Sequence, residues 1–414
     1  MIAGFMTRPR GGLWDNPDFL RLWAAQGLSA IGTRFTREGL PIIAALSLGA
    51  GATDLGLLVA LSALPGVLLS PFAGAWIDRT RRRRVLILAD LIRAAALISL
   101  PVLAWHDAIT IGHVMGVATV VALFSMLFQT ADNAYLPSIV EKDRLLDGNA
   151  KLATTDAVAE VAGPAAAGIA IQLFTAPVAI LFDALSYLWS AALLASIRRP
   201  EAPIETGEHA PNLWRETSEG LRFVFGHPVL RPMTLCFSTL MFFLSFFAPL
   251  YVLYAVRDLG IPPGILGFVI ALGGVSAVIG ARTATWAGRR FSPRGLLIGA
   301  LLAYGLAISF IPLAQGPLWF AVTLLCVAQL CGDGLYVVFH TNAVALRQTV
   351  TPDNLRGRES GVMHLLSGGL GLVAALLAGI MADIVGIRLI LWIGVGGVLA
   401  SILWLLALPR DVRK

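Results

Sequence analysis

Long apolar stretches alternate with short polar ones along the whole chain, and each apolar stretch can cross a bilayer as a helix of about 20 residues. Six precede residue 198, at about Leu20–Leu48, Leu55–Ile77, Val85–Trp105, Ile109–Leu136, Thr155–Phe174 and Val178–Ile197. Six more follow, at about Leu230–Val256, Gly264–Ala287, Gly295–Leu313, Leu318–Leu346, Gly361–Val385 and Leu389–Leu408. The pattern predicts an all-α polytopic membrane protein with twelve transmembrane helices.

A hydrophilic segment, Arg198–His227, separates the two groups of apolar stretches. It contains three prolines and then an amphipathic stretch, Asn212–Phe225, which we expect to lie along the membrane interface. The sequence therefore predicts an N-terminal six-helix half over 1–197, a linker with an amphipathic helix over 198–228, and a C-terminal six-helix half over 229–414.

Composition agrees with a membrane protein, since 57% of the 414 residues are hydrophobic and 14% are charged, against about 25% charged in soluble domains. The three cysteines lie in apolar runs without metal-ligand spacing. The sequence contains no P-loop, nucleophile elbow or histidine-rich cluster. We therefore expect no catalytic residue, metal or cofactor, and a protein that is not an enzyme.

Lysine and arginine gather in the loops on one side of the predicted spans, whereas the opposite loops hold only Arg257 and Arg388. Basic loops remain on the cytoplasmic side. We therefore expect a multi-pass protein of the cell (inner or plasma) membrane with both termini in the cytoplasm. The same asymmetry explains the net charge of +6, which in a soluble protein would suggest nucleic acid. No nucleic-acid partner is expected.

The chain also repeats itself weakly, at an offset of about 210 residues. The matching residues fall in corresponding loops of the two halves: Trp76, Arg79, Arg84, Leu86, Val140, Asp143 and Leu145 align with Trp286, Arg289, Arg294, Leu296, Val350, Asp353 and Leu355. Two parallel repeats related by an axis along the membrane normal are one known plan for transporters. The repeat predicts two pseudo-symmetric halves.

The loop between the second and third spans carries one acid followed by five arginines in six positions. Its pattern of Gly74, Asp78, Arg79, Arg83 and Arg84 resembles the loop 2–3 signature of the major facilitator superfamily, G-x-x-x-D-R-x-x-R-R, with the closing basic pair slightly shifted. The resemblance implies a conformational latch that locks the cytoplasmic ends of the two halves together in one state. The alternative is a positive-inside anchor, to which the acid would add nothing.

Five further segments resemble the macrolide-efflux and enterobactin-exporter branch of that superfamily. They are Phe19–Gln26, Gly32–Pro41, Gly163–Gly168, Asp183–Leu188 and Val350–Arg358. The resemblance implies a secondary active transporter that exports a moderately hydrophobic organic compound, such as a drug, by proton-coupled antiport and alternating access. It is compatible with multidrug resistance and with a monomer whose partners are a small-molecule substrate, protons and the lipid bilayer.

Other functions remain open at this point. Within transport, the alternative is a dedicated exporter of a metabolite, a siderophore or a lipid. Outside transport, the alternatives are a membrane-embedded enzyme or a sensor.

An ionisable side chain inside a span costs about 2.5–3.5 kcal/mol to insert and is a functional candidate by default. Glu38 in the first span lies one helical turn after Arg34, so we expect the two to pair on one helix face. Burial disfavours the charge of a carboxylate and a nearby arginine favours it, so such a group can exchange a proton as the conformation changes. The alternative is a self-neutralising structural pair. Asp132, Glu160 and Asp333 are rival proton carriers.

Two further features concern the substrate path. The Gly163-Pro164 pair predicts a kink in the fifth span, with Gly163 and Gly168 offering a small-residue contact surface like that of related antiporters. Candidates for the wall of a substrate cavity are Arg37, Phe243, Phe247 and Tyr251. Such aromatic residues also face lipid or core in many membrane helices.

Overall fold

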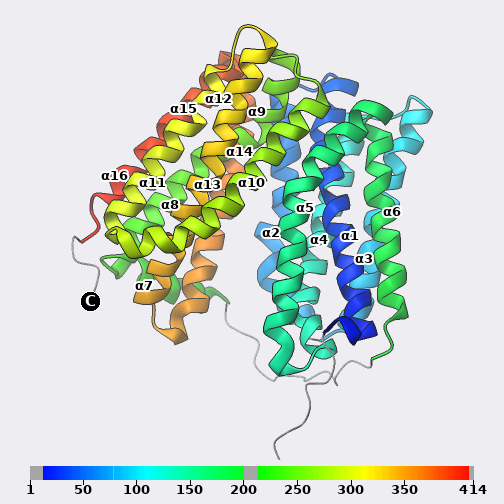
Figure 1. The fold of residues 1–414 in the computed structure, drawn as a ribbon, viewed down its shortest axis with the longest axis horizontal. Coiled ribbons are helices and arrows are strands. Elements are labelled where there is room, and N and C mark those ends of the chain that lie inside the picture. The colour runs from blue at the N-terminus through cyan, green and yellow to red at the C-terminus, as the bar shows by residue number, and fades with distance from the viewer. Residues whose placement is uncertain (1–12, 78, 200–212, 410–414) are drawn as a thin grey trace, which may run out of the picture.

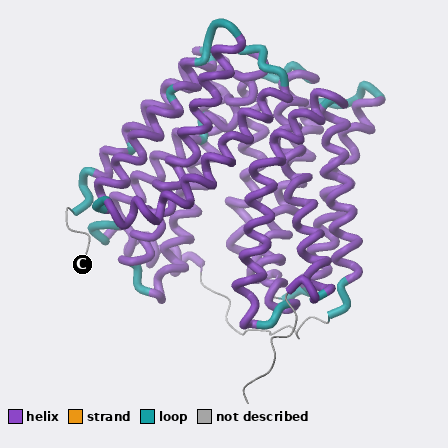
Figure 2. Tube along the Cα trace, viewed as in Figure 1, coloured by secondary structure: helices purple, strands orange, loops and turns teal. Residues whose placement is uncertain are grey.

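The computed structural model describes residues 13–77, 79–199 and 213–409, and helices form all the regular structure in these ranges (Figure 2). The helices before the linker are α1 (Pro17–Ile42), α2 (Ala52–Ile77), α3 (Arg82–Trp105), α4 (Ile111–Ile139), α5 (Leu145–Phe174) and α6 (Ala176–Ser196). After α7 (Leu213–Gly226) come α8 (Leu230–Leu244), α9 (Phe247–Leu253), α10 (Pro263–Arg290), α11 (Pro293–Ile308), α12 (Phe310–Leu313), α13 (Leu318–Val350), α14 (Arg356–Val385), α15 (Ile387–Ala400) and α16 (Ile402–Leu405).

Eleven stretches of the described chain are long and apolar enough to cross a membrane. Helix α1 has the length of a span at 26 residues but carries five charged residues, which lowers its hydropathy. It packs lengthwise against α5 and α6 as the neighbouring spans do (Figure 1). Counting α1, the arrangement has the twelve membrane helices that the hydrophobic pattern predicts, with α8/α9, α11/α12 and α15/α16 each forming one interrupted span.

The two halves repeat each other at an offset of 211 residues. The π-helical turn Ile43–Ser47 corresponds to Tyr254–Asp258, and the 3₁₀ turn Lys142–Arg144 corresponds to Asp353–Leu355. Even the left-handed backbone at Gly49 (φ 64°) returns at Gly260 (φ 65°). The weak repeat in the sequence is therefore confirmed, one residue longer than the offset of about 210 that side-chain matching suggested.

The halves meet at one end and diverge toward the other, where α7 lies (Figure 1). We call these the joined end and the linker end. Two helix pairs make most of the cross-half contact, α2 with α14 and α5 with α10, and α9 adds smaller contacts with α1 and α2. These pairs correspond to each other under the repeat, so the joined end is pseudo-symmetric.

Glycines let these two helix pairs approach closely. A Cβ added to Gly56 on α2 would lie 2.7 Å from the Ala375 carbonyl oxygen of α14 and 3.1 Å from the Gly379 Cα. A Cβ added to Gly168 on α5 would lie 2.9 Å from the Gly267 Cα of α10. Small residues at such crossings allow backbones to pack without side chains between them. The expectation that Gly168 lies on a contact surface is met, and its contact is with the other half.

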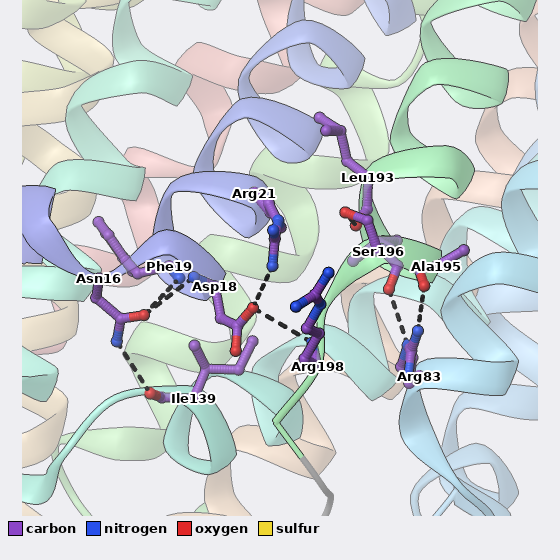
Figure 3. A network of polar contacts seen from close by, with 11 residues as sticks. Asn16, Asp18, Phe19, Arg21, Arg83, Ile139, Leu193, Ala195, Ser196 and Arg198 are labelled. Atoms are coloured by element: carbon purple, nitrogen blue, oxygen red, sulfur yellow. Dashed lines mark hydrogen bonds and ion pairs between the residues drawn. The ribbon is translucent and has the colours of Figure 1, made fainter.

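The linker ends of α1, α3, α4 and α6 are tied together by polar contacts (Figure 3). Asn16 caps α1 by accepting hydrogen bonds from the N–H groups of Asp18 and Phe19, at 3.0 and 3.2 Å. Arg83, in the first turn of α3, donates to the Leu194 carbonyl at 2.8 Å and to the Ala195 carbonyl. These carbonyls are among the last of α6, which lack intrahelical partners.

The second half repeats the arginine contact. Arg294, 211 residues after Arg83, donates to the Leu406 carbonyl at 2.7 Å, just past the end of α16. In each half, an arginine at the start of the third span therefore satisfies the carbonyl end of the last span.

The amphipathic stretch in the linker forms α7, which is docked on the C-terminal half. Val224 is buried against Leu230 and Val362, and Glu219 forms an ion pair with Arg358 at 2.7 Å. The sequence did not predict this docking onto α8 and α14. Residues 200–212, which include the linker prolines, lie outside the described residues.

Candidate substrate site

A cavity of about 680 Å³ lies between the halves and takes its wall from both, with residues of α1, α2 and α4 facing residues of α8, α9, α10 and α13. We call it the central cavity. Most of its wall is apolar, and Leu40, Leu58, Val121 and Phe247 are among the lining residues. A volume of this size and a mainly apolar lining are typical of sites for small organic molecules.

The polar groups of the central cavity are few. Arg37 and Glu38 are the charged residues among its described lining, both from α1. The Tyr251 hydroxyl is buried, lies toward the Gln329 amide, and lacks a partner of good hydrogen-bond geometry among the described residues. A buried hydroxyl needs a partner, and the Gln329 amide is the polar side chain placed nearest to supply it.

Glu38 and Arg37 belong to a chain of charges that continues onto α5. The Glu38 carboxylate lies 3.7 Å from the Arg37 guanidinium, which lies 3.2 Å from Glu160, which in turn pairs with Arg34 at 2.5 Å. We call these four residues the charge chain. Glu38 is buried, whereas the side chains of Arg37 and Glu160 are about half exposed. Two positive and two negative charges therefore neutralise one another across α1 and α5.

The expected ion pair of Arg34 with Glu38 is wrong. Arg34 pairs with Glu160 on the neighbouring helix instead, and Glu38 has Arg37 as its nearest cation. Gly163 makes this possible, because a Cβ there would lie 2.4 Å from the Arg34 Cγ. The stem of Arg34 thus lies over Gly163 and directs the guanidinium toward α5.

The other two proton candidates form no ion pair with the charge chain. Asp132 on α4 accepts a hydrogen bond from the Gln26 amide of α1, nearer the linker end. Asp333 on α13 faces α10, where a Cβ added to Gly273 would lie 2.0 Å from its Oδ2. Glycine at position 273 therefore makes room for the carboxylate, which makes no ion pair with any described residue.

Of the predicted cavity residues, Arg37, Phe247 and Tyr251 line the central cavity and Phe243 does not. Phe243 packs on α15, where a Cβ added to Gly397 would lie 2.0 Å from its ring. Phe247 also contacts α15, where a Cβ added to Gly394 would lie 2.7 Å from its ring. The two aromatic rings therefore face the same helix, although α8 ends at Leu244 and α9 begins at Phe247.

The loop signature is only partly described. Asp78 lies outside the described residues, and nothing lies within 4 Å of a Cβ built on Gly74. Arg83 binds carbonyls of its own half, while Arg79 and Arg84 are exposed. The halves are apart at this end (Figure 1), and the latch stays a prediction.

The Gly163-Pro164 segment lies within α5, which continues through it to Phe174. A kink at Pro164 stays a prediction. What the structure adds is that the Pro164 carbonyl oxygen faces α10, 2.3 Å from a Cβ built on Gly267. This part of α5 therefore belongs to the cross-half contact.

A sequence model of the Major Facilitator Superfamily matches residues 22–371, and a second, overlapping match covers residues 235–414. The chain belongs to the major facilitator superfamily. It is accordingly a multi-pass membrane transporter of the secondary type and not an enzyme.

Relatives of this facilitator include efflux proteins. It is 24% identical over 374 residues to the uncharacterized MFS-type transporter YfiS of Bacillus subtilis, covering 89% of this chain and 88% of that one. It is 26% identical over 376 residues to the multidrug efflux pump Tap of Mycolicibacterium fortuitum, covering 85% and 87%. Macrolide efflux protein A of Streptococcus pyogenes is 25% identical over 203 residues, which cover 49% of this chain and 50% of the relative.

Solved facilitator structures share the fold at low identity. A bacterial homologue of the iron transporter ferroportin in its inward-facing state superposes with a TM-score of 0.76 at 17% identity, covering 96% of this chain and 99% of that one. The outward-facing state of such a homologue, at 18% identity and covering 94% and 98%, gives 0.57. The nucleoside transporter NupG gives 0.75 at 12% identity, covering 94% and 98%.

Sequence reasoning on this facilitator missed several polar residues. Asp383 and Gln172, which close the joined end, were not singled out, although the offset of 211 places them in register. Gln329, on the cavity wall, was also missed. A neutral amide in an apolar helix gives a weak signal until its neighbours are known.

Proposed function

We propose that this transporter exports a moderately hydrophobic organic compound in exchange for protons, by alternating access. The observation that carries the proposal is the placement of Glu38, a buried carboxylate on the wall of an otherwise mainly apolar cavity. The efflux relatives support the direction of transport.

The lining of the central cavity supports the substrate class. Apolar side chains on both halves bind by burial of apolar surface, which has no directional requirement and tolerates different shapes. Arg37, Tyr251 and Gln329 supply the few polar contacts that orient a ligand. We therefore expect organic compounds with an apolar body and one or two polar groups.

The charge chain supports proton coupling through Glu38. When Glu38 carries a proton, Arg37 loses one of its two carboxylate partners and remains held by Glu160 alone. Arg37 is then free to turn toward the cavity, where a substrate would meet a changed wall. Asp132, Asp333 and Glu160 stay as rival carriers.

The distribution of basic residues supports an orientation with the linker end in the cytoplasm. The conformation described would then be inward-facing, because the halves separate at that end (Figure 1). The higher TM-score with the inward-facing than with the outward-facing ferroportin homologue agrees. Closure of the linker end would bring Gly74, Asp78, Arg79 and Arg84 toward α14, as the loop signature implies.

Transport in everted membrane vesicles tests the proposal. The lumen of vesicles containing the full chain is acidified so that protons leave as substrate enters, and uptake of a radiolabelled macrolide and of ethidium is followed before and after an ionophore collapses the gradient. Uptake of at least one compound that ends with the gradient supports proton-coupled export. Uptake unaffected by the ionophore, with counterflow exchange intact, would leave a transporter but remove the proton coupling.

A further inference from the structure

A second pocket, of about 440 Å³, lies at the linker end of the N-terminal half, between the end of α2, the start of α3 and α4. It shares no lining residue with the central cavity. We call it the arginine pocket, and six of its lining residues carry the argument: Trp76, Arg79, Arg81, Arg84, Leu88 and Phe124.

Three guanidinium groups of the arginine pocket have no partner among the described residues. Arg79, Arg81 and Arg84 are exposed, and none forms a hydrogen bond or ion pair with a described residue. Arg82 and Arg83 between them differ, because they donate to helix-end carbonyls of α4 and α6. The described lining of the pocket contains no acid beside these three positive charges.

The rest of the pocket wall is apolar and belongs to membrane spans. Leu88, in the second turn of α3, is 55% exposed, and Trp76, at the end of α2, is 50% exposed. Phe124 of α4 continues the apolar wall. Tryptophan is enriched at the depth of lipid headgroups, and basic side chains at a helix end reach the same layer.

We propose that the arginine pocket binds an anionic phospholipid, with the headgroup phosphate on Arg79, Arg81 and Arg84 and an acyl chain along Leu88 and Phe124. A planar guanidinium binds phosphate oxygens through two parallel hydrogen bonds, which makes a cluster of three a strong phosphate site. Basic pockets between membrane helices bind anionic lipid headgroups in this way. The inference is independent of the transported substrate and of the direction of transport.

The charge balance favours an anionic over a zwitterionic lipid. A choline headgroup brings a cation beside its phosphate, and the described lining offers no carboxylate to receive it. A soluble phosphate ester has the same phosphate chemistry but leaves Leu88 and Phe124 uncovered. The lipid therefore gains binding free energy from the arginine side and from the apolar side of the pocket, whereas a soluble ester gains it from the arginine side alone.

Native mass spectrometry of the purified full chain tests the proposal. The protein is titrated with phosphatidylglycerol and with phosphatidylcholine of the same acyl chains, and bound lipids are counted. Each arginine near the headgroup contributes roughly fivefold to affinity. The double variant Arg81→Gln/Arg84→Gln should therefore bind phosphatidylglycerol roughly 25-fold more weakly than the parent.

The matched control is Arg289→Gln/Arg290→Gln, the same loss of two charges in the corresponding loop of the other half. Both arginines are exposed at the linker end of α10 and bind no described residue. The control should keep the parent affinity within about twofold. Equal losses in the two double variants, or no loss in either, would overturn the proposal, as would equal binding of the two lipids by the parent.

A second comparison tests the apolar wall. Leu88→Ser should weaken phosphatidylglycerol binding but leave the affinity for glycerol phosphate, measured by displacement of the lipid, unchanged. Leu91→Ser removes an exposed leucine of α3 outside the pocket and should change neither affinity. Glycerol phosphate binding as tight as phosphatidylglycerol would show a soluble phosphate site instead of a lipid site. Thermal unfolding of each variant confirms that the fold is retained.

Discussion

The Asp383 carboxylate, near the end of α14, accepts a hydrogen bond at 3.0 Å from the N–H of Ala52, the first residue of α2. It accepts another from Thr53 at 2.9 Å. Under the repeat, Asp383 corresponds to Gln172 on α5, which accepts from the Gly264 N–H of α10 at 3.0 Å. At the joined end, each of these two side chains therefore accepts from the N-terminus of a helix in the other half. Only Asp383 also brings a full negative charge to that N-terminus.

Replacing Asp383 by asparagine should weaken the joined end. Asparagine keeps an acceptor oxygen but loses the charge, which is worth about 0.5–1 kcal/mol at a helix N-terminus. We expect a two- to fivefold shift toward conformations open at that end. Distances between spin labels on the two halves at the joined end, in a background without Cys236, Cys326 and Cys331, measure the shift.

Asp54→Asn is the control for that experiment. Asp54 lies in the first turn of α2 and accepts a hydrogen bond from Gly51 of its own half at 3.0 Å. Its loss should alter the α2 N-terminus without releasing a cross-half contact. Equal label distances in the Asp383 variant and the parent would count against a closing role for Asp383.

The close approach of α5 and α10 should be sensitive to one methyl group. In Gly168→Ala, the new Cβ would lie 2.4 Å from the Pro263 carbonyl oxygen and 2.9 Å from the Gly267 Cα. Overpacking of this kind costs about 1–3 kcal/mol, and the cost falls on the state in which the two helices touch. We expect slower transport and a population shifted away from the conformation described here.

Gly116→Ala on α4 provides the matched control, since nothing lies within 4 Å of its added Cβ. Transport assays and spin-label distances should be unchanged in this variant. If Gly168→Ala also transports at the parent rate, the two helices separate too little during transport for the contact to matter.

Glu160 should be needed for stability as well as for charge balance. Glu160→Gln leaves Arg34, whose side chain is 17% exposed, without its carboxylate partner. Because Glu160 itself is 44% exposed, we expect a loss of about 1–3 kcal/mol, less than for a fully buried pair. Thermal unfolding of Glu160→Gln, Arg34→Gln and the double variant forms a mutant cycle. Additive effects would show that the pair contributes nothing.

Glu38→Gln should separate proton-driven efflux from substrate exchange. Glutamine resembles the protonated carboxylate in size and shape but cannot release a proton. Gradient-driven efflux should be abolished, while exchange of labelled for unlabelled substrate, which moves no net proton, should continue. Both rates are measured in the same proteoliposomes. Gradient-driven efflux at the parent rate would mean that the carrier is Asp132, Glu160 or Asp333.

Asp78→Asn tests the latch that the loop signature implies. We expect reduced turnover with unchanged expression and substrate binding, because the carboxylate is proposed to act only when the linker ends meet. Helix α14 begins at Arg356, and a negative charge is favoured near such an N-terminus. Turnover equal to that of the parent would remove the gating role.

The helices and the halves follow from the sequence because their causes are local or repeated. Runs of apolar residues specify spans, and the offset of 211 links the halves. Side-chain partners depend instead on which helices are neighbours. Arg34 and Glu38 are one turn apart on α1, yet α5 packs on that face and offers Glu160 over the gap left by Gly163. No intrahelical spacing contains that information.

The cavity wall was harder to predict for a related reason. Phe243 and Phe247 are four residues apart and both contact α15, yet only Phe247 also lines the central cavity. Glycine positions were informative only in part. Gly168 was recognised as a contact residue, but the residue that it contacts, Gly267, belongs to the other half. That partner is identified only once the packing of the two halves is known.

The bonds from Arg83 to the end of α6 and from Arg294 to the residue after α16 bear on how the chain is made. In each half the acceptor carbonyls lie more than a hundred residues after the arginine, so the hydrogen bonds form only after that much more of the chain has emerged from the ribosome. Residue 194 precedes the linker, so the first bundle can close before any span of the second leaves the ribosome. We expect nascent chains whose residues up to 199 have left the ribosomal tunnel to resist proteolysis already, and chains that still hold residues before 190 inside it to remain sensitive.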